Sequence, residues 1–178
     1  YTTAQAMAQA AIQLVEGNPT YNRSQAGILR LAEAQMAWGV AAMRNEEYSI
    51  AHQNMQRALS LSRLISAGET LSGKALYLQA EALRHLGNLN YFQNDPSVGA
   101  NYHNQAMEIY RDLGNLRGEA YTLVSLGALA IQANQFPEAI DYHERGLKVS
   151  EKIGDQLGQA RAMNNLGDIY AQLGDYVR

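Results

Sequence analysis

Histidine is the residue type in this chain best suited to hold a metal ion or to move a proton near neutral pH. The chain has four, His52, His85, His103 and His143, and no cysteine. His103 and His143 each follow a tyrosine and stand 40 residues apart, at equivalent positions of a repeat. Packed helices lie about 8–10 Å apart, whereas zinc needs each ligand nitrogen about 2 Å away. We therefore predict no metal site and interpret both rings as packing groups in an aromatic position.

Other residue types that support catalysis or phosphate binding lack the companions that the chemistry requires. Gly114 and Gly118 have neither a preceding strand nor a following lysine, so they do not form a phosphate-binding loop. Glu46 and Glu47 read as a solvated helix start, and no serine stands in the glycine pattern of a nucleophile elbow. We therefore predict that the chain is not an enzyme and needs no cofactor.

The elements that would position these residues are repeated helix pairs of about 40 residues. Small residues recur at three fixed offsets, and glycine inside a helix costs about 1 kcal/mol relative to alanine unless a close helix crossing requires it. The three sets are Gly39, Ala82, Gly127 and Gly167; Ala51, Gly99 and Ala139; and Ala58, Ala106 and Gly146. Such a register predicts an all-α chain of stacked antiparallel pairs.

Hydrophobic period and turn residues set the expected boundaries. We predict a helix over 1–16 that is the second helix of a partial repeat, then full repeats over 24–66, 73–113 and 117–153 and a partial repeat over 156–178. Gly114 and Gly154 are expected in the left-handed conformation at helix ends, and Asp155 is expected to cap the next helix. The 73–113 repeat carries five extra residues, which the turn residues of 91–97 place in a loop rather than in a helix.

These residues resemble the tetratricopeptide repeat over nearly the whole chain. The first-helix pattern is met by Leu123, Leu126-Gly127 and Ala130 and again by Met163, Leu166-Gly167 and Tyr170, and the second-helix pattern by Phe136, Ala139, His143 and Gly146. Glu81 departs from the expected large apolar residue, and the closing proline is absent. The sequence looks most like the 40-residue subtype, which occurs in kinesin light chains, in spindle-orientation adaptors and in bacterial signalling proteins and transcription regulators. The resemblance implies a right-handed α-solenoid.

The resemblance also implies a concave groove lined by the first helix of each unit, which would bind a peptide or protein segment. Counting from the Leu-Gly step gives its lining positions, in which Arg161 would hold a carboxylate and Asn165 a peptide bond. The peptide-binding residues expected on this basis are Leu76, Leu83, Tyr121, Ser125, Gln132, Arg161, Asn165, Asp168 and Gln172. We expect a protein-interaction scaffold or adaptor. The alternative is a sensor or coupling segment of a multidomain bacterial signalling protein or transcription regulator.

Composition narrows the classes of partner. The chain has 178 residues and a formal net charge of −3, which argues against a nucleic-acid footprint. No apolar run approaches the 18 residues of a membrane span, and the lack of cysteine favours a reducing compartment, so we expect a cytoplasmic protein. The sequence begins without Met and ends inside a helix pair, so we interpret it as a fragment of a longer protein. Its exposed terminal helices could self-associate.

Overall fold

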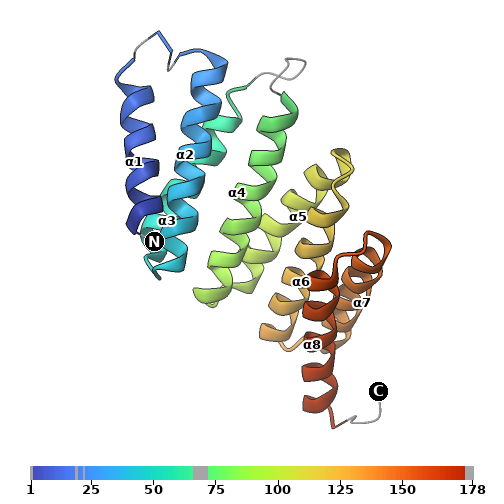
Figure 1. The fold of residues 1–178 in the computed structure, drawn as a ribbon. Coiled ribbons are helices and arrows are strands. Elements are labelled where there is room, and N and C mark those ends of the chain that lie inside the picture. The colour runs from blue at the N-terminus through green and yellow to red at the C-terminus, as the bar shows by residue number, and fades with distance from the viewer. Residues whose placement is uncertain (1, 19, 22, 66–71, 175–178) are drawn as a thin grey trace. The chain divides into compact units, whose positions relative to one another are not determined.

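The computed structural model describes residues 2–18, 20–21, 23–65 and 72–174, and within these ranges all regular structure is helical. Within these described residues, eight helices follow one another (Figure 1). They are α1 (Thr2–Glu16), α2 (Gln25–Arg44), α3 (Tyr48–Ser62), α4 (Ser72–Phe92), α5 (Pro96–Asp112), α6 (Leu116–Gln132), α7 (Phe136–Lys152) and α8 (Gln156–Gln172). The predicted all-α pattern of stacked pairs is confirmed. The partner helix expected to begin in 175–178 lies outside the described residues.

The turns between helices use one repeated capping device. The side chains of Asn115 and Asp155 accept hydrogen bonds from the amides of Gly118 and Gly158, at 3.0 and 3.3 Å, and so satisfy amides at the starts of α6 and α8. The preceding glycines, Gly114 and Gly154, have φ of +63° and +68°, in the left-handed region that ends a helix most easily at glycine. Both predictions for these turns are confirmed.

Two predicted boundaries were wrong. The extra residues of the 73–113 repeat lie partly in a helix, because α4 continues through Tyr91 and Phe92 and has 21 residues against 17 in α6. The backbone turns only after Phe92, at Asn94, which has φ of +58°. The helix expected to reach residue 66 ends at Ser62, where the serine hydroxyl donates to the carbonyl of Leu59 and competes with the helical pattern.

The chain forms two compact units, which divide between Leu89 and Asn90 near the end of α4. In the first unit, Ile12 and Val15 of α1 pack against Leu31 and Ala34 of α2. In the second unit, α6 packs against α5, α7 and α8. Its core contains two clusters, one around Met107, Leu123 and Leu126 and the other around Ala130, Ala139 and Ile169.

The small residues inside helices stand where a neighbouring helix comes close. A Cβ atom at Gly39 would lie 2.9 Å from Cγ of Met55, and one at Gly127 would lie 2.5 Å from Cε1 of His143. These two contacts confirm that Gly39 and Gly127 permit a tight crossing. Gly167 differs, because a Cβ atom added there would meet nothing within 4 Å.

Candidate interaction surface

Arg161 and Tyr121 form the centre of a polar cluster in the second unit. The guanidinium carbon of Arg161 on α8 lies 5.5 Å from the centroid of the Tyr121 ring on α6, which is cation–π distance. Among the residues that the structure describes, no ion pair joins Arg161 to a carboxylate, and none joins it to Asp168. The guanidinium of Arg161 is therefore placed beside the Tyr121 ring.

Asp155 anchors the other end of Tyr121. The Tyr121 side chain interacts with the Asp155 carboxylate, and the Nε atom of Arg117 lies 3.7 Å from Oδ2 of the same carboxylate. Burial favours the neutral form of Asp155, but the Gly158 amide, the Tyr121 hydroxyl and the Arg117 charge together lower its pKa. Burial and the contact with Asp155 raise the pKa of Tyr121. The Tyr121 ring is thus neutral at neutral pH.

The other residues expected on α8 share the face that carries Arg161. Asn165 follows at a spacing of four and is half-buried, and Asp168 and Gln172 continue the strip and are exposed. Ser125, one turn beyond Tyr121 on α6, is half-buried. The neighbouring first helices α6 and α8 carry Tyr121, Ser125, Arg161 and Asn165, all within the second unit.

Three expected groove residues have different surroundings. Leu83 on α4 is 2% exposed, because its side chain packs in the apolar core. The expectation that it lines an open surface was therefore wrong. Leu76 is 38% exposed but, like Leu83, belongs to the first unit. The side-chain amide of Gln132 donates a hydrogen bond to the carbonyl of Tyr91 at 3.0 Å. This donor is therefore used within the protein rather than offered to a peptide.

A second polar cluster lies on α4 and accounts for the departure at Glu81. The Nη2 atom of Arg84 lies 2.7 Å from a carboxylate oxygen of Glu81 and 3.1 Å from Nε2 of His85. Burial and the Arg84 charge lower the pKa of His85 to about 4, although Glu81 opposes the shift, so the ring is neutral near pH 7. The only sign of this cluster in the sequence is the unexpected carboxylate.

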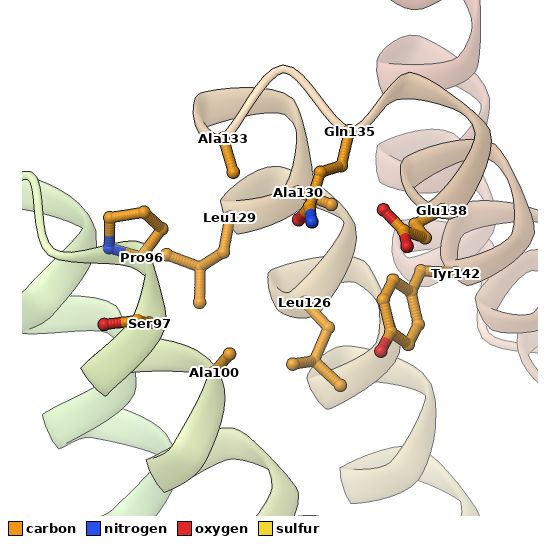
Figure 2. Close-up of a pocket in the computed structure, with 10 residues that line it drawn as sticks. All are labelled: Pro96, Ser97, Ala100, Leu126, Leu129, Ala130, Ala133, Gln135, Glu138 and Tyr142. Atoms are coloured by element: carbon orange, nitrogen blue, oxygen red, sulfur yellow. The ribbon is translucent and has the colours of Figure 1, made fainter.

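A hollow of the second unit lies on a face of α6 that sequence reasoning did not single out. It has a volume of about 430 Å³. Figure 2 shows Leu126 and Leu129 between Pro96 and Ala100 of α5 on one side and Glu138 and Tyr142 of α7 on the other. None of the nine predicted groove residues lines it. The hollow depends on how far α5 and α7 lie from each other on either side of α6, and no local sequence pattern predicts that distance.

The surface carries no arrangement of metal ligands or membrane-spanning segment within the part of the chain that the structure describes. Groups of three or more His, Asp or Glu side chains that could hold a metal ion do not occur there. His103 and His143 are 1% and 0% exposed, in agreement with their interpretation as packing residues. None of the described helices combines the length and apolarity that a membrane crossing requires.

Comparison with known proteins supports the repeat architecture. The sequence matches the tetratricopeptide repeat family model over residues 78–152 and 118–178. Among solved structures, BtubC (BKLC) from P. vanneervenii is similar in fold, with a TM-score of 0.58 and 14% sequence identity, over 98% of this chain and 85% of that one. No curated protein matches the sequence.

Proposed function

Because this chain belongs to the tetratricopeptide repeat family, we propose that it is a cytoplasmic scaffold whose second unit binds, through α6 and α8, a peptide segment that carries one acidic residue. Repeats of this family generally mediate protein–protein interaction and are typically non-enzymatic. The observation that carries the proposal is Arg161 stacked on Tyr121 with no ion-paired carboxylate among the described residues. A peptide carboxylate would supply that partner.

The ligand chemistry follows from the strip around Arg161. A guanidinium binds a carboxylate through two parallel hydrogen bonds, and the cation–π contact with Tyr121 holds the Arg161 guanidinium near that ring. Asn165, one turn away, has a donor and an acceptor with which it can hold a peptide bond. Asp168 lies on the same face farther along α8 and disfavours a second acidic residue there. The fitting segment has one acidic residue among neutral or basic ones.

Peptide selection tests this assignment even though the natural partner is unidentified. The chain is used as bait for a displayed random-peptide library, and the dissociation constants of selected peptides are measured by calorimetry at 0.15 M salt. We expect enrichment of one acidic position and a loss of affinity of roughly tenfold to 150-fold in Arg161→Ala, the scale of about 1.5–3 kcal/mol for a hydrogen bond to a charged group.

Two further variants make the test specific. Arg161→Lys retains the charge but not the planar fork, so it should recover only part of the lost affinity. Glu144→Ala changes an exposed residue of the outer helix α7 and should bind as the parent chain does. If Glu144→Ala abolishes capture while Arg161→Ala binds normally, the outer helices form the working surface and the proposal fails.

A further inference from the structure

The hollow over Leu126 and Leu129 is not filled by an aromatic side chain, although every other repeat has a ring at one of two equivalent positions of its first helix. The position three residues after the small residue of the first helix is occupied, in chain order, by Ala42, His85, Ala130 and Tyr170. The repeat with Ala42 has Trp38 just before its small residue, whereas the third repeat has Leu126 there. Both Ala130 and Leu126 line the hollow, so the third repeat has neither ring.

A further aromatic residue is missing at the start of α5. The second helices α3, α5 and α7 begin with Tyr48, Pro96 and Phe136, respectively. Pro96 is half-buried and lines the hollow, so a proline stands where the other two helices carry an aromatic residue. Figure 2 shows Pro96 and Ala130 beside Leu129. The hollow thus lies where two aromatic side chains of the repeat are replaced by smaller ones.

The hollow has the size and the lining of a site for one aromatic side chain. A cavity of about 150 Å³ is large enough for benzene, and this hollow has a volume of about 430 Å³. Leu126, Leu129 and Ala130 are 4%, 3% and 6% exposed and form an apolar base. Aromatic side chains that enter such pockets carry much of the binding energy of protein interfaces, because they bury a large apolar area. Since α5, α6 and α7 are interior helices of the second unit, both flanks of the hollow are present in the structure.

The charge at the rim of the hollow favours a cation. Of the described residues that line it, only Glu138 is charged; it is exposed, and no ion pair joins it to another described residue. Asp95, the N-cap of α5, adds a second carboxylate, and the two carboxylates offset the positive ends of the α5 and α7 dipoles. Arg145, whose guanidinium carbon lies 5.8 Å from the centroid of the Tyr142 ring, is already paired with Asp141 at 2.9 Å. A basic group of a ligand would therefore meet an unpaired carboxylate.

We propose that this hollow binds a segment of a partner protein in which an aromatic residue adjoins a lysine or an arginine. The aromatic ring would pack on Leu126 and Leu129, and the basic group would pair with Glu138 at the exposed edge. Repeats of this family generally mediate protein–protein interaction, which favours a protein segment as the source of this chemistry. The hollow shares no residue with the cluster around Arg161 and selects the opposite charge, so the proposal is independent of the function proposed above.

Short end-blocked peptides serve as probes. One contains adjacent Phe and Lys, a second contains Phe and Glu, and a third contains Ala and Lys, with alanine and glycine elsewhere. Each is titrated at low ionic strength into the isotope-labelled chain, up to roughly 10 mM because a single side chain in a pocket gives weak affinity, and the amide signals are followed by NMR. We expect the Phe–Lys peptide to shift the amides of Ser97, Ala100, Ala133 and Glu138, and the Ala–Lys peptide to shift none of them.

The acidic peptide tests the role of Glu138. The Phe–Glu peptide should bind roughly fivefold more weakly than the Phe–Lys peptide, the scale of an exposed ion pair. Glu138→Gln should remove this preference, whereas Glu144→Gln, at an exposed glutamate of α7 outside the hollow, should retain it. A Phe–Glu peptide that the parent chain binds as tightly as Phe–Lys contradicts the proposal, and so does a Phe–Lys peptide that shifts no amide of the hollow.

Restoring the missing rings tests the hollow itself. Pro96→Tyr and Ala130→Tyr should each weaken binding of the Phe–Lys peptide at least roughly tenfold, because the new ring occupies the space that the peptide needs. Pro96→Ala fills nothing, and Val98→Tyr adds the same ring at an exposed position outside the hollow, so both should bind as the parent chain does. Circular dichroism and the unfolding midpoint verify folding, and Pro96→Tyr carries the test if Ala130→Tyr does not fold. A folded Pro96→Tyr variant with the parent affinity overturns the proposal.

Two further measurements distinguish other sites and other occupants. Arg161→Ala should leave binding of the Phe–Lys peptide unchanged, and a loss of binding in this variant would place the peptide at the α6–α8 cluster and overturn the proposal. Light scattering measures the mass of the chain alone as its concentration rises. If that mass increases and Pro96→Tyr abolishes the increase, a second copy of the chain occupies the hollow and the proposal of a different partner is wrong.

Discussion

The imidazole of His143 occupies the space that a side chain at Gly127 would fill. A Cβ atom at Gly127 would lie 2.5 Å from Cε1 and 2.6 Å from Nε2 of that ring, and His143 is fully buried. Because the two residues come from α6 and α7, their contact sets the distance between the helices of this pair. The glycine and the histidine are thus one packing unit rather than two independent features.

Adding volume at Gly127 should therefore destabilise the second unit. We expect Gly127→Ala to lower the free energy of unfolding by about 1–3 kcal/mol and Gly127→Leu to lower it by more, because a close-packed crossing must open. Chemical denaturation monitored by circular dichroism measures the change. If Gly127→Leu unfolds at the same denaturant concentration as the parent chain, the packing register is wrong.

Gly167 provides the matched control for this effect. A Cβ atom there meets nothing within 4 Å, so Gly167→Ala should raise the free energy of unfolding by up to about 1 kcal/mol through helix propensity alone. Chemical denaturation monitored by circular dichroism measures the change. Destabilisation by Gly167→Ala would show that another group already packs against this glycine.

The stability of the chain should fall as the pH is lowered from about 6.5 towards 4. Burial lowers the pKa of His143 to about 4, whereas the unfolded chain has an ordinary value near 6.5. Between these values the unfolded state binds more protons, so stability rises with pH, by at most about 1.4 kcal/mol per pH unit for one histidine. The slope should be smaller in His143→Gln, measured by denaturation at pH 5 and pH 7. An unchanged slope would assign the pH dependence to other groups, such as His85.

Replacing Glu81 by the residue that the repeat pattern favours should destabilise the chain. Substitutions towards a family pattern commonly stabilise, but Glu81→Leu removes the carboxylate that Arg84 contacts at 2.7 Å in a mostly buried setting. We expect a loss of about 1–3 kcal/mol in the free energy of unfolding. Thermal and chemical denaturation measure it, with the exposed change Glu144→Leu as a control of similar chemistry. A more stable Glu81→Leu variant would mean that the ion pair contributes less than apolar packing at this position.

The pKa of Asp155 should rise when the Tyr121 hydroxyl is removed. In the parent chain the Gly158 amide, that hydroxyl and the Arg117 charge hold the pKa below its usual range against the effect of burial. Carboxyl carbon chemical shifts in a pH titration should show a higher value in Tyr121→Phe and an unchanged value in Tyr102→Phe, which lies on α5. Equal titration curves for the parent chain and Tyr121→Phe would exclude the hydrogen bond between the two side chains.

Sequence reasoning succeeded where local chemistry decides the structure. The glycines at 114 and 154 and the carboxylate at 155 mark helix ends because backbone conformation and capping depend on a few neighbouring residues. It failed at the end of α4, because the turn residues at 94–96 do not prevent the helix-compatible residues before them from extending the helix. It also failed at Leu83, because a position on a first helix can face a groove or a core according to how its neighbours pack.

The candidate site was predictable only in part. The spacing of Arg161 and Asn165 placed both on one face of α8, and the repeat offset placed Tyr121 beside them. The link from Tyr121 to Asp155 and Arg117 joins α6 to the turn before α8, and such a contact depends on how successive pairs are stacked. The hollow over Leu126 and Leu129 arises for the same reason.

The packing between neighbouring helices has a consequence for how the chain acquires its structure. Each pair of helices whose packing is described lies no more than two helices apart along the chain, as with α6 and α8. Each helix therefore packs against helices that are close to it in sequence, and helical proteins with such local contacts fold in microseconds to milliseconds. During synthesis, α6 can close on α7 as soon as both have left the ribosome, so assembly can proceed from the N-terminus without waiting for the last helix.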